Sequence, residues 1–371
     1  MRVTIDATPL LLRSAGVKNY FYFWLKHLRR LAGTDRIRAF PFLGEVGALT
    51  HEVSVISPRS TWPRLGILYF VNIPGNPAIN WLISQPDVFH VSNQVRNPPR
   101  RPRLTATVHD MTCRLMPELH TPANVQADRT HADRVLRCAS GLIAVSENTK
   151  NDTVRLLGVD PEIVEVIYPG VAEAYFEAAG GDVSGMKKAY GLHRPYLLYV
   201  GTIEPRKNLD TLIDAYGELG DLRKEFDIIV IGSAGWSAEK TMQRLRSGEH
   251  GVRYLGYVPE DDLPVLMAGA AVFVYPSLYE GFGFPVAQAM ACGVPVVVSG
   301  VSSLPEVVGD AGLLVDPRSV VELEAALRRL LTDPNLRNEL ATKGRGRAGR
   351  FRWDICAQRS LEFFHRVAGR L

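Results

Sequence analysis

Tyr275-Pro-Ser-Leu-Tyr-Glu-Gly-Phe-Gly-Phe-Pro285 is the strongest local signal in this sequence and has the form of a strand, a glycine loop and a helix start. It follows an apolar, strand-like run and leads into a helical pattern, with Pro285 suited to the first turn. Gly281 and Gly283 allow backbone amides to approach a ligand, and a helix start favours negative charge such as a diphosphate. A plain strand-to-helix turn would contain the same glycines. Glu280 favours a binding site, because a carboxylate beside an anion must face another group, such as sugar hydroxyls.

The same alternation of apolar β-rich runs and helical patterns extends through the chain, which is typical of parallel sheets covered by helices. Its length of 371 residues exceeds the roughly 250–300 at which single cores stop growing. We therefore expect an α/β protein of two doubly wound domains, 1–180 and 181–352, joined within 171–194. Candidate strands are 2–8, 39–43, 53–57, 88–92, 104–108, 141–146 and 164–168 in the first half, and 195–200, 226–231, 252–258, 272–276, 295–299 and 313–315 in the second.

Helix signals agree with this division. Asn208 is placed to cap a helix that starts at Leu209, and Ser303 with Glu306 three residues later forms a capping-box pattern. The C-terminal stretch 353–371 is amphipathic, so we expect it to dock back on the N-terminal domain.

Composition excludes several classes of protein. No apolar run approaches 18 residues and the N-terminus is strand-like, which predicts a cytoplasmic protein without a signal peptide or membrane span. The four cysteines are far apart and form no paired metal-ligand spacing, so no zinc site is expected.

Charge is unevenly distributed. Residues 1–103 contain fourteen Lys and Arg against five Asp and Glu, while the remainder is net negative. This favours an anionic partner for the first half: a phosphorylated acceptor, a membrane surface or nucleic acid, with a solvated basic face as the alternative. Nucleic acid is disfavoured because the basic loops lack interleaved aromatics. The aromatic run 20–24 is interpreted as helical core, with interfacial membrane contact, supported by the basic loop 96–103, as the alternative.

A second motif, Gly201-Thr-Ile-Glu-Pro-Arg-Lys-Asn208, follows the first strand of the second domain. Ligands of open α/β sheets bind beyond the carboxyl ends of strands, so Arg206 and Lys207 are well placed to bind phosphate. An Arg-Lys pair in a loop is otherwise commonly just solvated.

With these motifs the chain resembles the family 4 glycosyltransferases of the GT-B fold, and in particular bacterial mannosyltransferase-like members, over almost its whole length. The resemblance implies two facing Rossmann-like domains with a cleft between them. It also implies a motif of two glutamates separated by seven residues. Glu280 matches the first glutamate, which contacts the donor sugar, whereas Gln288 replaces the second, which binds the ribose. Gln288 still forms hydrogen bonds but lacks a charge.

The resemblance further implies roles for residues outside this motif. Arg206 and Lys207 would neutralise the donor diphosphate, and His109 would reach the donor sugar, unless it is a structural histidine that Asp110 orients. The glycine loop of the family corresponds to Gly16 in this chain. The family's loop near the nucleotide corresponds to the loop at Gly232, although this glycine could serve only the turn. The donor-binding residues implied in total are Gly16, Gly232, Gly281, Phe282, Gly283 and Gln288, beside the catalytic group His109, Glu280, Arg206 and Lys207.

The activity implied by the resemblance is retaining transfer of a hexose to a glycan or lipid-linked acceptor in polysaccharide assembly. GDP-mannose is the favoured donor and UDP-sugars are the runner-up. The nucleotide sugar is a co-substrate, and no metal or other cofactor is expected. Peripheral contact with an anionic membrane through the basic half is a further expectation. Gln288 and the altered loop 15–19 leave a non-catalytic sugar-nucleotide-binding protein as the rival hypothesis.

Overall fold

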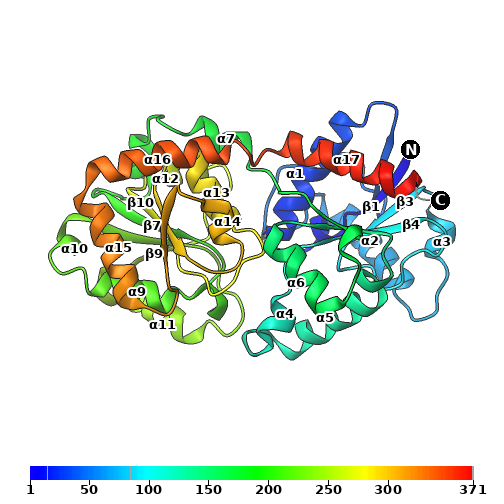
Figure 1. The fold of residues 1–371 in the computed structure, drawn as a ribbon, viewed down its shortest axis with the longest axis horizontal. Coiled ribbons are helices and arrows are strands. Elements are labelled where there is room, and N and C mark those ends of the chain that lie inside the picture. Colours follow the sequence, from blue (N-terminus) through cyan, green and yellow to red (C-terminus); the bar gives the residue numbers. More distant parts are fainter. Residues whose placement is uncertain (15, 84, 370–371) are drawn as a thin grey trace. The chain divides into compact units, whose positions relative to one another are not determined.

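The structure is a computed structural model that describes residues 1–14, 16–83 and 85–369, and the chain divides into two compact units (Figure 1). The first unit comprises Met1–Gly170 and the chain from Trp353 onward, and the second comprises Val171–Arg352. The division falls after Gly170, whereas the sequence predicts it after residue 180. The segment 171–194, predicted as a linker, contains two short helices, α7 (Glu173–Glu177) and α8 (Ser184–Ala189), which pack on helices of the second unit.

The described part of the first unit holds a six-stranded parallel sheet in the order β2-β1-β3-β4-β5-β6. Short runs such as Val88–Val91, buried at every position and apolar except for His90, explain why these strands lie inside the sheet. The strands are β1 (Arg2–Asp6), β2 (Arg36–Phe40), β3 (Val88–Val91), β4 (Arg103–Val108), β5 (Gly141–Ala144) and β6 (Val164–Val166).

Two strand predictions in this unit need correction. The strand expected at 39–43 ends at Phe40, because Pro41 has no amide for the ladder. The prediction of a strand at 53–57 is wrong. Val55 is buried there, but its amide donates to the Leu10 carbonyl at 3.1 Å and its carbonyl accepts from the Gly47 amide at 2.9 Å. This segment is therefore a loop held against the short helix Thr8–Leu11.

The C-terminal helix α17 (Trp353–Gly369) packs against α1 (Gly16–Leu31) within the first unit (Figure 1). The Trp24 indole Nε1 donates to Ser360 Oγ at 2.9 Å, and Tyr20, Trp24 and Leu28 are completely buried. Tyr20, Phe21 and Trp24 of α1 thus belong to the core, whereas Tyr22 and Phe23 are half-buried. The other helices of this unit are α2 (Pro58–Val71), α3 (Ile79–Leu82), α4 (Thr112–Leu115), α5 (Pro122–Arg134) and α6 (Glu147–Leu157).

In the second unit, a six-stranded parallel sheet runs in the order β12-β11-β10-β7-β8-β9 over the described residues. Each strand predicted for this half is present. The chain builds outward from β7 in one direction and restarts at β10 beside it, so the strand order reverses between these two strands. The strands are β7 (Tyr196–Val200), β8 (Asp227–Ile231), β9 (Arg253–Gly256), β10 (Val272–Tyr275), β11 (Val296–Ser299) and β12 (Gly312–Val315).

Helices cover this second sheet, and side-chain caps explain where several of them begin. The Ser319 and Asp333 side chains accept from the amides of Glu322 and Leu336, which fixes the starts of α15 and α16. None of the helices in the described residues is both long enough and apolar enough to cross a bilayer. The remaining helices are α9 (Leu209–Gly217), α10 (Leu222–Glu225), α11 (Glu239–Ser247), α12 (Leu263–Ala268), α13 (Phe284–Ala291), α14 (Leu304–Val308), α15 (Val320–Thr332) and α16 (Pro334–Ala348).

Both predicted cap side chains act differently from the expectation. Asn208 precedes α9 in a left-handed conformation, with φ +57°, and its Nδ2 donates to the Pro276 carbonyl at 2.9 Å and the Pro317 carbonyl at 2.6 Å. Ser303 precedes α14, but its hydroxyl donates to the Glu280 carbonyl at 2.9 Å. The predicted caps instead join loops at the carboxyl edge of the sheet.

Candidate functional site

Two loops meet where the strand order reverses in the second unit. One follows β7 and contains the short helix Pro205–Lys207, and the other follows β10 and runs to α13. The Leu278 amide donates to the Arg206 carbonyl at 2.8 Å, and Asn208 holds the Pro276 carbonyl. Because β7 and β10 are neighbours, Lys207 and Glu280, which lie 73 residues apart in the sequence, are brought into contact.

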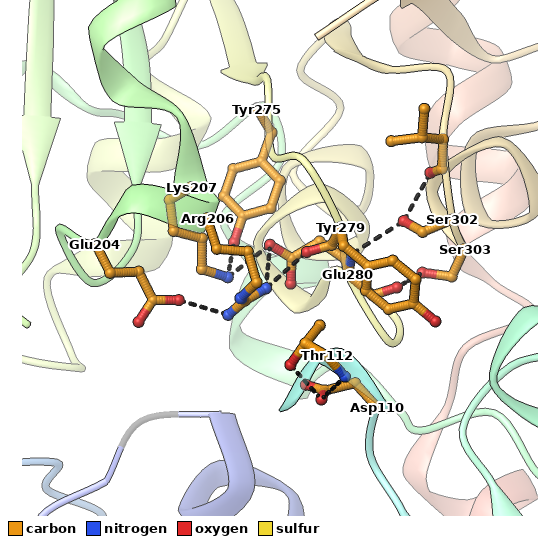
Figure 2. Close-up of polar contacts among 11 residues, drawn as sticks. Asp110, Thr112, Glu204, Arg206, Lys207, Tyr275, Tyr279, Glu280, Ser302 and Ser303 are labelled. Atoms are coloured by element: carbon orange, nitrogen blue, oxygen red, sulfur yellow. Dashed lines mark hydrogen bonds and ion pairs between the residues drawn. The ribbon is translucent and has the colours of Figure 1, made fainter. Parts of the chain in front are cut away.

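A buried cluster of charges lies at this junction (Figure 2). Lys207 Nζ donates to Glu280 Oε1 at 2.6 Å and to the Tyr275 hydroxyl at 2.9 Å. Arg206 Nη1 lies 3.2 Å from the same Glu280 oxygen and donates to the Tyr279 carbonyl at 2.6 Å. Arg206 Nη2 donates to Glu204 at 2.6 Å. The structure thus brings together three of the four residues predicted to be catalytic.

Neighbouring charges keep Glu280 ionised despite its burial. Burial alone would raise the pKa of Glu280, but the positive charges of Lys207 and Arg206 and the hydrogen bond from Lys207 outweigh it and lower this pKa to about 2. Burial and the neighbouring Arg206 charge lower the pKa of Lys207, and the Glu280 charge opposes this shift. Buried ions cost free energy unless they are paired, so the cluster forms as a unit.

The backbone of Glu280 is fixed from a third loop. Its amide donates to Ser302 Oγ at 2.9 Å, and its carbonyl accepts from Ser303 Oγ at 2.9 Å. Ser302 itself adopts φ +55°, an uncommon conformation for a residue with a side chain. Such backbone strain persists where surrounding contacts over-determine it, which is common at functional sites.

Sequence reasoning missed Glu204, Tyr275, Ser302 and Ser303. A usable signal exists for the serines, because they follow β11 and so end at the same sheet edge as the two recognised motifs. Tyr275 is the last residue of β10, and Glu204 is two residues before Arg206. The side chains of Tyr275 and Glu204 have polar groups and are buried, a combination that needs a hydrogen-bond partner.

The predicted glycines differ in what their positions require. Gly283 precedes α13 with φ +91°, and a Cβ there would lie 2.6 Å from Leu304. Gly232 has φ +147°, and a Cβ would lie 1.9 Å from the Gly201 carbonyl oxygen, so close approach of two loops already demands glycine. Gly281 is buried in the loop after Glu280.

Two further predicted donor residues flank this loop. The Phe282 ring is buried and packs edge-on against Phe284 and Phe351, so a ligand contact from this residue would come from its backbone. Gln288 lies half-buried in α13, and its side chain makes no hydrogen bond within the part of the chain that the structure describes. Its amide is therefore not part of the Glu280 cluster.

The remaining predicted residues, His109 and Gly16, belong to the first unit. His109 follows β4, and its ring packs edge-on against Tyr20 of α1, with 4.9 Å between ring centroids. Burial lowers the pKa of His109 to about 4, although the Asp110 charge raises it, so the ring is neutral at pH 7. Asp110 accepts from the Thr112 amide and hydroxyl at 3.0 and 2.7 Å and thereby fixes the turn into α4 (Figure 2).

Gly16 begins α1 and is exposed, and a Cβ there would meet nothing within 4 Å. The fold itself therefore does not require glycine at this position. Ala15, the altered neighbour in the predicted glycine loop, lies outside the described residues. Within the described ranges, no group of three His, Cys, Asp or Glu side chains is placed to hold a metal ion.

Similarity to known proteins covers both units. Residues 15–175 match the model of Glycosyltransferase Family 4, and residues 187–347 match that of glycosyl transferases group 1. O-antigen chain mannosyltransferase B of Escherichia coli is 36% identical over 271 residues, which is 72% of this chain and 71% of that protein. A D-inositol 3-phosphate glycosyltransferase of Streptomyces bingchenggensis is 32% identical over 62% of this chain and 54% of that protein. The chain spans only 29% of the serotype-specific mannosyltransferase of Escherichia coli.

Solved structures agree on the fold. Sucrose-phosphate synthase from Thermosynechococcus elongatus superposes with a TM-score of 0.74 at 19% identity and 99% coverage of both chains. HepE from Anabaena, in complex with UDP and glucose, superposes with a TM-score of 0.69 at 20% identity, covering 97% of this chain and 98% of HepE. The fold, the two family models and the 36% identity to a mannosyltransferase all indicate the same family. The chain belongs to the family 4 glycosyltransferases of the GT-B fold.

Proposed function

We propose that this chain is a retaining hexosyltransferase that moves mannose from GDP-mannose to a glycan or lipid-linked acceptor in polysaccharide assembly. The observation that carries the proposal is the buried Glu280 carboxylate held between Lys207 and Arg206 at the carboxyl edge of the second sheet. A nucleotide sugar offers a diphosphate to the cations and hydroxyls to the carboxylate. The identity of 36% to an O-antigen mannosyltransferase supports mannose as the sugar.

Before the donor binds, Glu280 neutralises the cations that the diphosphate needs. When the diphosphate pairs with Lys207 and Arg206, the Glu280 oxygens become available to accept from sugar hydroxyls. Arg206 keeps Glu204 as a partner, and Lys207 keeps the Tyr275 hydroxyl, so both cations stay oriented during the exchange. The site is therefore preorganised for negative charge on the leaving group.

Retention follows from attack on the face that the leaving group occupies. The bond between sugar C1 and the diphosphate oxygen breaks, and the acceptor hydroxyl oxygen bonds to C1. The proton of that hydroxyl passes to the departing diphosphate. This route needs no protein nucleophile, which leaves the Glu280 carboxylate to bind the sugar once the diphosphate has taken over its two cations.

The other predicted roles form part of the same proposal. His109 would act as a neutral hydrogen-bonding group for the donor sugar, and Gln288 would bind the ribose through its amide. Gly16 and Gly232 would allow loops to approach the donor. Arg206 and Lys207 would supply the positive charge for the leaving group, so transfer should persist in a chelator such as EDTA. A cytoplasmic location at the inner face of the membrane suits a lipid-linked acceptor.

The donor base has one specific competitor. The solved HepE structures contain UDP, UDP with glucose, or UDP-glucose, which favours a UDP-sugar as the second candidate. A panel of nucleotide sugars distinguishes the candidates through thermal stabilisation. A donor at a hundred times its Kd adds about 2.7 kcal/mol to the free energy of unfolding. Stabilisation by UDP-glucose but not by GDP-mannose would overturn the choice of donor, and binding without any transfer would favour a non-catalytic protein.

Lys207→Ala tests the proposed chemistry. Loss of the ammonium group should lower kcat by about 100-fold or more, the usual effect of removing one group that stabilises a developing negative charge. Sugar transfer and donor hydrolysis measure it, with circular dichroism to verify folding. Lys224→Ala, at an exposed lysine of the same unit, is the matched control. Near-normal turnover by the Lys207 variant would contradict the proposed role.

A further inference from the structure

An unusual surface of the first unit remains unexplained by sugar transfer. Of the twelve large hydrophobic side chains that are exposed among the described residues, eight fall between residues 42 and 82. Trp62 is 73% exposed, Tyr69 77% and Trp81 84%. Exposed large apolar groups that lie together commonly mark a binding surface. The eight are Phe42, Val53, Trp62, Tyr69, Phe70, Ile73, Trp81 and Leu82.

Three of these residues, Trp62, Tyr69 and Phe70, belong to helix α2. Its exposed positions include Arg59, Trp62, Gly66 and Tyr69, a spacing of three and four residues that follows one face of a helix. The opposite face buries Thr61 and Val71. A helix that is apolar toward solvent as well as toward the core is expected to face a partner or a membrane.

Basic residues are tied to the same surface by hydrogen bonds. The Arg96 amide donates to Asn72 Oδ1 at 2.8 Å, just after α2 ends. The Arg100 amide donates to Asn80 Oδ1 at 2.9 Å, beside Trp81 in α3. Asn97 Nδ2 donates to the Ile73 carbonyl at 2.8 Å. The loop that carries Arg96, Arg100 and Arg101, all exposed, is thus fixed against the segments that carry the exposed aromatics.

The segments that carry α2, α3 and the loop 96–101 contain no acidic residue. No Asp or Glu occurs between Glu52 and Asp87, and none between Asp87 and Asp110. Asp87 pairs with Arg2, and Glu52 pairs with Arg13. Helices α2 and α3 and the loop 96–101 therefore carry arginine, tryptophan, tyrosine and phenylalanine and no carboxylate of their own.

We propose that the face formed by α2, α3 and the loop 96–101 binds the surface of an anionic lipid bilayer. Tryptophan and tyrosine favour the boundary between headgroups and acyl chains, where one end of the ring is apolar and the other wet. Arginine pairs with lipid phosphates through two parallel hydrogen bonds. This face differs from the aromatic helix considered from the sequence, α1, in which Tyr20, Phe21 and Trp24 are buried.

The surface extends the proposed function, whose acceptor is lipid-linked, by holding the enzyme where such an acceptor is embedded. Its test measures binding to vesicles and not sugar transfer. Failure of one proposal therefore leaves the other standing.

The experiment uses the full chain and vesicles of phosphatidylglycerol mixed with phosphatidylcholine, compared with phosphatidylcholine alone. We expect cosedimentation with the anionic vesicles, weakened by salt because charges near a membrane are screened. Tryptophan emission should shift to the blue on binding, because Trp62 and Trp81 leave water. The double variant Trp62→Ser/Trp81→Ser should lose this shift and bind at least about tenfold more weakly, given the apolar area removed.

A second variant separates charge from apolar contact. Arg100→Gln/Arg101→Gln should weaken binding about tenfold, since each basic residue near the surface contributes to attraction. Matched controls lie in the second unit: Tyr257→Ser/Leu314→Ser for exposed apolar groups, and Arg318→Gln/Arg350→Gln for exposed arginines. Control variants should bind as the wild type does.

Three results would overturn the proposal. They are no binding to anionic vesicles, equal binding by the tryptophan double variant, or loss of binding in the second-unit controls to the same extent. Light scattering adds a further check. Conversion of a dimer to a monomer by Trp62→Ser/Trp81→Ser, without vesicle binding by the wild type, would instead assign this face to a second copy of the chain.

Discussion

At the scale of single residues, the Glu280 carboxylate can bind either the cations Lys207 and Arg206 or the hydroxyls of a donor sugar. In the absence of a donor, its carboxylate pairs with Lys207 and Arg206, which the diphosphate must then share or take over. The carboxylate therefore competes with the ligand for the same cations. Removing its charge separates this competition from its contribution to sugar binding, because the two effects have opposite signs.

We predict that Glu280→Gln binds free GDP more tightly while transferring sugar more slowly. Lys207 loses its anionic partner, so a diphosphate meets a stronger positive charge and less repulsion, and we expect about a tenfold lower Kd for GDP, equivalent to about 1.4 kcal/mol. Transfer should fall about 100-fold or more, because the charge-assisted hydrogen bonds to the sugar are lost. Titration calorimetry with GDP and a transfer assay measure the two effects.

Glu204→Gln is the control, since it changes the partner of Arg206 but leaves the pair between Lys207 and Glu280. Its effect on GDP affinity should be smaller. Weaker GDP binding by Glu280→Gln would show that the carboxylate supports the diphosphate site and does not compete with it.

Residues of this cluster differ in how far the sequence predicts them. Arg206, Lys207 and Glu280 sit in motifs whose glycines, charges and position after a strand are visible locally. Tyr275, Ser302 and Ser303 matter only because β7, β10 and β11 are consecutive neighbours in the sheet. Periodicity identifies strands but does not specify which strands pair, so their partners become evident only in three dimensions.

At the scale of elements, the close packing of α17 against β5 depends on Gly141. A Cβ at Gly141 would lie 2.8 Å from both Phe363 and Val367, closer than side chains approach. Phe363 and Val367 are buried, so neither has free space to move into. Helix α17 therefore packs at a distance that only glycine permits.

We predict that Gly141→Ala destabilises the first unit by about 1–3 kcal/mol, the usual cost of overpacking a core. Amide hydrogen exchange should become faster in α17 and in the part of α1 that it covers, but not in the second unit. Exchange measured by mass spectrometry on the full chain reports each unit separately. Gly346→Ala is a suitable control, because a Cβ there meets nothing within 4 Å. Unchanged exchange in α17 would contradict the packing argument.

Elements of the second unit are the better predicted ones, for a physical reason. Runs such as Val296–Ser299, buried at every position, are bounded by glycine and proline, which leaves few alternatives. The segment 53–57 has the same apolar character, yet its backbone bonds to Leu10 and Gly47 in place of a strand. A loop that buries one valine resembles a strand in sequence.

At the scale of the whole molecule, three neutral histidines make the stability of the first unit sensitive to acid. Burial lowers the pKa of His90 to about 3 and those of His109 and His131 to about 4. His90 lies between Thr105 and Thr107, with each ring nitrogen 3.0 Å from a hydroxyl. The unfolded chain takes up protons near pH 6.5, where the folded chain does not.

We predict that the first unit loses stability as the pH falls from about 6.5 toward 4. In this window the unfolded state binds more protons, so each histidine lowers the free energy of unfolding on the order of 1 kcal/mol per pH unit. Thermal unfolding across this range measures the slope, and His90→Gln, which keeps hydrogen-bonding groups without the titration, should reduce it. An identical slope in that variant would refute the contribution of His90.

The return of α17 to the first unit has a consequence for how the protein is made. Ribosomes synthesise the chain from its N-terminus, so the whole of Val171–Arg352 is translated before α17 exists. The second unit can complete its core at that stage, while Trp24 still lacks Ser360 and the rings of α1 lack their cover. The first unit therefore begins to be synthesised first but completes its fold last. Until then, the uncovered side of α1 is the surface that a nascent-chain chaperone would meet.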